Sequence, residues 1–211
     1  MRTLVVLLSA AVWLGACASA PKGPEPLSDE QFKAAMEATK APSNLPGGDD
    51  FARVRALTAL IDRPELTPEQ RIEALYMRAV LKGTTAEDRT GAIADYQTVI
   101  ETAPAGHRLI ERAKENKAYA ETQMGHINRR LAQGPAGQTS QYFQDLLAAG
   151  RHDEAAQFFR DGKGSSVYAV EKLHKLGYLC EGPGYSGPSY TWGYGNTRQV
   201  AVQWCDTKAG Q

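Results

Sequence analysis

Apolar residues recur at the spacing of an amphipathic helix along most of this chain, and prolines and glycines separate the apolar segments. The pattern predicts helices over residues 28–39, 49–62, 67–82, 87–102, 107–131, 139–149, 153–159 and 165–175. Three later segments alternate apolar and polar residues, which predicts strands over residues 178–180, 190–194 and 198–205. The chain is therefore predicted to be mainly α, an antiparallel array of helical hairpins that ends in a small α+β module.

Two of the predicted helices begin with a capping box. Ser28 is followed three residues later by Gln31, and Thr67 is followed in the same way by Gln70. Each pair can satisfy two backbone N–H groups at a helix N-terminus. Pro68 strengthens the second signal, because proline is favoured at the first helical position.

Residues 69–104 place small and large side chains at regular offsets. The first predicted helix of this stretch carries Ile72, Leu75, Tyr76 and Ala79. The second carries Ala92, Tyr96 and Val99, and Pro104 follows it. This pattern resembles the tetratricopeptide repeat, whose unit is two antiparallel helices. The resemblance covers about residues 49–160. It implies a close helix contact at Ala92 and a short groove that holds a peptide or a helix of a partner protein.

Parts of the chain depart from the repeat pattern. Tyr76 stands where the family has a small residue, and the helix expected over residues 107–131 fits no standard unit. A generic bundle of helical hairpins with the same alternation of small and large residues is the alternative. Both architectures predict a binding surface built from stacked helices.

The N-terminal segment has the three parts of a secretory signal peptide. Arg2 supplies a positive charge, Leu4 to Trp13 form an apolar run, and small residues precede Cys17. The apolar run is too short to cross a bilayer comfortably, because a spanning helix needs about 20 apolar residues.

The segment Leu14-Gly15-Ala16-Cys17 resembles the lipobox of bacterial lipoproteins. The resemblance implies that the Cys17 sulfur carries a diacylglyceryl group, that the chain is cleaved before Cys17 and that the new N-terminus is acylated. Ala18 is not the aspartate that retains many such proteins at the inner membrane. The resemblance therefore implies a periplasmic protein on the inner leaflet of the outer membrane. Cleavage after Ala20 and an uncleaved anchor helix are the alternatives.

These signals divide the chain into four segments. Residues 1–16 are the expected signal peptide, and residues 17–48 contain the lipidated cysteine, a tether rich in proline and glycine, and a short helix. Residues 49–162 are expected to form the helical array, and residues 163–211 the α+β module.

Cys180 and Cys205 are the two cysteines that remain once Cys17 is assigned to the lipid. Exported proteins fold in an oxidising compartment, so this pair is expected to form a disulfide that closes the C-terminal module. In the chain-entropy model, a bond that closes a loop of this size stabilises the folded state by about 3–4 kcal/mol. Two free thiols are the alternative.

Aromatic residues gather in the same module: Tyr185, Tyr190, Trp192, Tyr194 and Trp204. One interpretation is that they form the core of a small sheet that lacks other bulky side chains. The other is a stacking surface for a sugar ring or a peptide. In that case Tyr185, Tyr190 and Trp192, which lie nearest the loop rich in glycine and proline, are expected to contact the ligand.

Charge and motifs narrow the function further. The chain has 24 basic and 24 acidic residues and no basic cluster, which argues against nucleic-acid binding. Its four histidines stand singly and are expected at the surface, and no nucleophile motif, phosphate loop or metal-ligand spacing occurs. We therefore expect a non-catalytic adaptor or assembly scaffold without metal or cofactor. It would be attached to the membrane through Cys17 and would bind another envelope protein or peptide. A cell-wall or glycan-binding lipoprotein that uses its C-terminal aromatics is one alternative. An enzyme whose catalytic groups meet from distant positions of the chain is the other.

Overall fold

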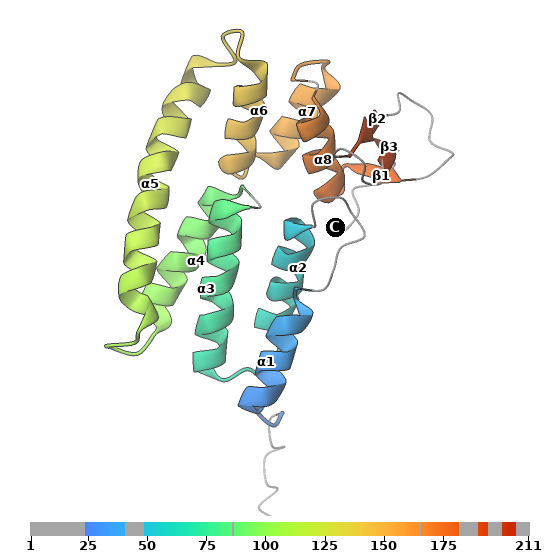
Figure 1. Ribbon diagram of the computed structural model, residues 1–211. Coiled ribbons are helices and arrows are strands. Elements are labelled where there is room, and N and C mark those ends of the chain that lie inside the picture. Colours follow the sequence, from blue (N-terminus) through green and yellow to red (C-terminus); the bar gives the residue numbers. More distant parts are fainter. Residues whose placement is uncertain are drawn as a thin grey trace, which may run out of the picture.

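The computed structural model describes residues 24–40, 49–85, 87–164, 166–181, 190–193 and 200–205, and within them the protein is mainly helical (Figure 1). The helices are α1 (Asp29–Ala38), α2 (Asp50–Ile61), α3 (Pro68–Thr84), α4 (Arg89–Thr102), α5 (Leu109–Gln133), α6 (Thr139–Ala148), α7 (His152–Arg160) and α8 (Val167–Lys175). The strands are β1 (Leu179–Glu181), β2 (Tyr190–Trp192) and β3 (Val200–Trp204). This architecture confirms the predicted fold class, an array of helical hairpins with a small C-terminal α+β module.

Both capping boxes expected from the sequence are present. Ser28 Oγ accepts a hydrogen bond from the Gln31 backbone N–H (3.2 Å), and Gln31 Oε1 accepts one from the Ser28 N–H (2.9 Å). Thr67 and Gln70 form the same reciprocal pair at the start of α3, where Pro68 is the first helical residue. The local sequence therefore determines where α1 and α3 begin.

The end of α3 lies close to the start of α4. The sequence places the end of α3 at Gly83, but the helix continues to Thr84. A Cβ atom added to Gly83 would lie 3.4 Å from the Cβ of Ala92, which is fully buried. Gly83 therefore serves the packing of the two helices, and the close contact expected at Ala92 is observed.

Two hydrophobic clusters form the core, and the division between them falls within α5. The first, which we call the N-terminal tier, comprises α1–α4 with Leu109 and Ala113 of α5. The second, the C-terminal tier, comprises α6–α8 and the sheet with Met124, Ile127 and Leu131 of α5. Figure 1 shows α5 running along both tiers. This long helix, which fits no standard repeat unit, joins the two halves of the molecule.

The small sheet has the strand order β1-β3-β2, and both strand pairs are antiparallel. Helix α8 packs against β1 and β2. A disulfide joins Cys180 of β1 to Cys205, directly after β3, with the two Cα atoms 5.2 Å apart. The pairing is the one expected from the sequence, and it connects two neighbouring strands.

The side chains of the sheet share one hydrophobic cluster with α6 and α7, across the boundary expected at residue 162. The ring of Phe159 on α7 lies 5.1 Å from that of Tyr190 on β2 and 6.0 Å from that of Trp204 on β3, measured between centroids. The guanidinium of Arg160 lies 4.3 Å from the centroid of the Trp204 ring. Because its strands are three to five residues long, the sheet needs α7 as well as α8 to cover its apolar side chains. The contacts across residue 162 lead us to expect that α7 and the sheet unfold together.

Candidate functional site

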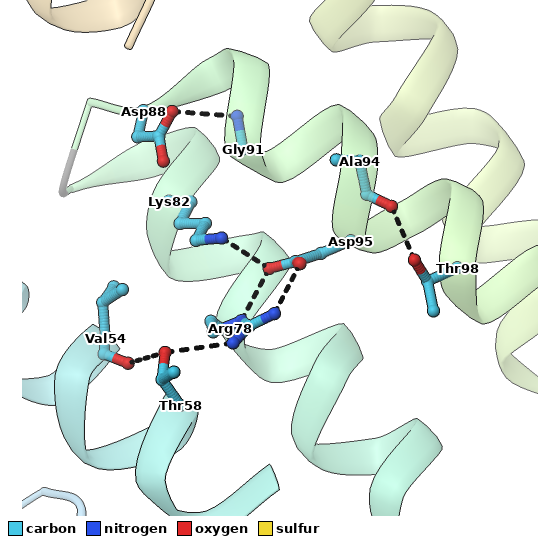
Figure 2. A network of polar contacts seen from close by, with 9 residues as sticks. All are labelled: Val54, Thr58, Arg78, Lys82, Asp88, Gly91, Ala94, Asp95 and Thr98. Atoms are coloured by element: carbon cyan, nitrogen blue, oxygen red, sulfur yellow. Dashed lines mark hydrogen bonds and ion pairs between the residues drawn. The ribbon is translucent and has the colours of Figure 1, made fainter. Parts of the chain in front are cut away.

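A buried carboxylate ties three helices of the N-terminal tier together (Figure 2). Asp95 on α4 accepts hydrogen bonds from Nε (2.8 Å) and Nη2 (2.7 Å) of Arg78 on α3, and the ammonium of Lys82 lies 3.0 Å away. The remaining nitrogen of Arg78, Nη1, donates to Thr58 Oγ1 on α2 (3.0 Å). The Asp95 side chain is only 7% exposed. This network therefore fixes α2, α3 and α4 relative to one another rather than offering a ligand site.

Tyr96, which follows Asp95 on α4, is also buried. Burial raises the pKa of Tyr96 to about 12, and the neighbouring Tyr76 adds to the effect. The Tyr96 hydroxyl therefore stays protonated at any pH near neutrality. The Tyr96 ring is part of the hydrophobic core of the N-terminal tier.

A second carboxylate–arginine pair joins α5 to α6 in the C-terminal tier. Arg130 donates from Nε (2.8 Å) and Nη2 (2.6 Å) to Asp145, which also accepts a hydrogen bond from Gln141 Nε2 (2.9 Å). The hydrogen bond to Asp145 raises the pKa of Arg130. The two partners differ in exposure, because the side chain of Asp145 is 3% exposed and that of Arg130 is 44% exposed. Unlike Arg78, Arg130 has an Nη1 group that makes no hydrogen bond to any described residue.

This pair forms the wall between two polar hollows. The first, the turn hollow, has a volume of about 240 Å³ and lies where the turn between α5 and α6 meets both helices. The second, the junction hollow, has a volume of about 280 Å³ and lies where the two tiers meet. Arg130, Gln141 and Asp145 line both hollows. The two hollows are therefore neighbouring parts of one polar depression.

The junction hollow draws its lining from both tiers. Thr84, Glu87 and Arg89 come from the N-terminal tier, and Gln123, Gln144 and Tyr168 come from the C-terminal tier. Arg89, Gln123 and Gln144 make no hydrogen bond or ion pair with any residue that the structure describes. The hollow therefore presents the unpaired guanidinium of Arg89 and two side-chain amides to an incoming group, beside the Nη1 group of Arg130.

The acidic residues of the junction hollow are already engaged. Glu87 accepts a hydrogen bond from the Tyr168 hydroxyl, and the Lys172 ammonium lies 3.5 Å from its other carboxylate oxygen. Asp145 is bound by Arg130 and Gln141. Glu87 also has a φ of 55°, which is rare for a residue other than glycine. Its contacts to α8 hold that backbone in place.

Of the three aromatic residues predicted to contact a ligand, the structure describes Tyr190 and Trp192. Trp192 is fully buried, and its Nε1 donates a hydrogen bond to His174 Nδ1 (3.0 Å). It therefore cannot stack on a sugar from the solvent, contrary to that expectation, because the small sheet uses it as core. Tyr190 is half-buried against Phe159. Tyr185 and the lipidation residue Cys17 lie outside the described residues.

Two histidines differ from the sequence expectation of surface positions. The side chains of His107 and His174 are 7% and 11% exposed, because His107 lies against Glu69 of α3 and His174 against Trp192 of β2. His126 is exposed and contacts Arg129. Among the described residues, no three histidine, cysteine or acidic side chains gather closely enough to hold a metal ion. Over the same part of the chain, no helix is both long enough and apolar enough to cross a bilayer.

The polar depression has no clear signal in the sequence. Arg89, Gln123 and Gln144 are scattered over three helices, and nothing in their local sequence marks them. Asp145 did carry a signal, because an aspartate beside Leu146 and Leu147 on an apolar helix is expected to have a buried partner. The fold and the depression together define a helical-hairpin array with a polar recess at the junction of its two tiers. No family model, no curated protein and no solved structure matches the chain.

Proposed function

We propose that this protein is a non-catalytic, membrane-anchored periplasmic adaptor, and that the junction hollow holds a segment of another envelope protein. The observation that carries the proposal is the unpaired donor set of Arg89, Gln123 and Gln144 in a recess built from both tiers. The acids beside these donors, Glu87 and Asp145, are bound by neighbouring side chains. A recess with free donors and engaged acids suits binding better than proton transfer.

The membrane-anchored part of the proposal is supported by the lipobox-like segment that ends at Cys17. Each methylene group buried in the bilayer contributes about 0.8 kcal/mol, and stable anchoring needs more than one chain. A cysteine that carries several acyl chains meets that requirement. The inner leaflet of the outer membrane remains the location that this segment implies.

The alternative, a glycan-binding lipoprotein, has less support. It relies on exposed aromatic rings at the C-terminal end, but Trp192 is fully buried and Tyr190 packs on Phe159. Sugar recognition by stacking needs an accessible ring face. We therefore favour a protein or peptide partner.

Replacing Cys17 with serine is expected to release the protein from the membrane fraction and to abolish the lipid mass. The reason is that serine has no sulfur to accept the diacylglyceryl group. Fractionation of the envelope and mass spectrometry of the N-terminal peptide measure the two effects. Replacing Cys180 and Cys205 with serine together is the control, and it should leave the lipid in place. A Cys17→Ser protein with unchanged mass and location would contradict the lipoprotein proposal.

Filling the junction hollow is expected to remove the partner. The indole ring of a Gln144→Trp variant is larger than the glutamine side chain and should occupy the recess. Tyr119→Ala is the control, because Tyr119 on α5 is 68% exposed. The measurement is quantitative co-purification from detergent-solubilised envelope, with equal thermal melting of the variants as the test of folding. The proposal expects envelope proteins that are recovered with the parent and with Tyr119→Ala but depleted with Gln144→Trp. Equal recovery with all three, or recovery of wall fragments alone, would contradict it.

A further inference from the structure

We propose that the segment held in the junction hollow is an extended acidic peptide, and that Arg89, Gln123 and Gln144 bind one of its side-chain carboxylates. This inference rests on the function proposed above and names the chemistry of the partner. It follows from the charge of the recess, from the donors that line it and from its division into two hollows.

The charge around the junction hollow leaves one cation without a counterion. Arg130 is paired with Asp145, and Lys172 is paired with Glu87. Arg89 lines the same hollow and has no acidic partner among the described residues. A half-buried guanidinium is best satisfied by a carboxylate, with which it can form two parallel hydrogen bonds.

The side-chain amides of Gln123 and Gln144 can also donate hydrogen bonds to a carboxylate. Gln123 on α5 and Gln144 on α6 line the hollow with Arg89 of α4, so donors from three helices face one space. A carboxylate offers about four lone-pair positions, which matches donors that come from different sides. A basic side chain in this space would be repelled by the Arg89 guanidinium. It would also find no free acceptor in Glu87 or Asp145, because neighbouring side chains already bind both carboxylates.

The division into two hollows points to a peptide rather than a compact small molecule. Each hollow is smaller than the roughly 300–1,000 Å³ of ordinary small-molecule sites, at about 240 and 280 Å³. In an extended chain, alternate side chains point the same way, so two of them can enter adjacent hollows. The Arg130 Nη1 group, on the shared wall, is placed to donate to the peptide carbonyl between them.

The test is a titration of the isotope-labelled full chain in detergent with blocked peptides, followed by nuclear magnetic resonance. The probes are Ac-Ala-Glu-Ala-Glu-Ala-amide and its glutamine counterpart, Ac-Ala-Gln-Ala-Gln-Ala-amide. The acidic peptide is expected to shift the side-chain N–H signals of Arg89, Gln123 and Gln144, and to bind about tenfold or more tightly than the glutamine peptide. Arg89→Gln should weaken it by a similar factor. Arg112→Gln, which removes an exposed arginine of α5, is the matched control and should change nothing.

The outcomes separate this inference from the proposed function. Equal binding of both peptides at the three signals would overturn the acidic specificity but leave a peptide site in the hollow. If neither peptide shifted the three side-chain signals, the inference would be overturned. The co-purification experiment would then decide the proposed function on its own. Equally tight binding of the single residue N-acetylglutamate amide would show that the hollow takes a small acid, and would overturn the extended peptide.

Discussion

Replacing Asp95 with alanine is expected to lower the free energy of unfolding by about 3–5 kcal/mol, the usual cost of removing one partner of a buried ion pair. The carboxylate is bound by Arg78 and Lys82, whose side chains are only 15% and 16% exposed. Without it, two cations face each other in a buried space and Arg78 keeps only its hydrogen bond to Thr58 (Figure 2). Urea unfolding followed by circular dichroism measures the change.

Two comparisons isolate the cause of this loss. Asp95→Asn keeps the volume and removes the charge, so most of the loss should persist if the ion pairs are responsible. Glu111→Ala removes an acid of α5 that is 77% exposed and pairs only with Lys114, and should change stability by less than about 0.5 kcal/mol. A loss below about 1 kcal/mol for Asp95→Ala would mean that the network does not hold α2, α3 and α4 together.

Replacing Trp192 with alanine is expected to cost about 3–5 kcal/mol, because the side chain is fully buried and its removal leaves a large cavity. The variant also loses the hydrogen bond from Trp192 Nε1 to His174. Denaturant unfolding with the disulfide intact measures the stability. Tyr119→Ala is the control, since Tyr119 is an aromatic residue that is 68% exposed, and it should have little effect.

The same variant tests how the C-terminal tier is organised. Because Trp192 belongs to one cluster with Phe159 of α7 and Leu146 of α6, its removal should reduce hydrogen-exchange protection in α6 and α7 as well as in the sheet. Protection lost only after residue 162 would restore the independent module expected from the sequence. Equal loss in α3 and α4 would instead show that the two tiers unfold together.

Local sequence signals were sufficient for most of the secondary structure. The capping residues Ser28 and Thr67 located two helix starts, and the spacing of apolar residues located the remaining helices to within a few residues. Alternation of apolar and polar residues also located β2 and β3. These features depend on contacts between residues close in the chain, which a single sequence displays directly.

The division into tiers could not be found in the same way. Gly162 follows α7 with a φ of 76°, and such a break suggests the end of a domain. The structure shows that Phe159, before this break, packs on Trp204, which lies far beyond it. Contacts of this kind depend on tertiary packing, for which short-range periodicity gives no evidence.

The polar recess was hidden for a related reason. Arg89, Gln123 and Gln144 meet only because α5 is long enough to reach both tiers. On their own helices they read as ordinary partly exposed polar residues. A buried aspartate such as Asp145 is the one member of the site whose position on an apolar helix face could have drawn attention to it.

Photo-cross-linking in living cells tests whether the junction hollow holds a segment of a partner protein. A photoreactive p-benzoylphenylalanine is placed at position 144, inside the hollow, or at position 119, on an exposed face of α5. We expect a discrete light-dependent adduct with an envelope protein from position 144 and none with that protein from position 119. Mass spectrometry of the adduct should locate the bond in an acidic segment of the partner. No adduct from position 144, or the same adduct with equal yield from position 119, would contradict the proposed site.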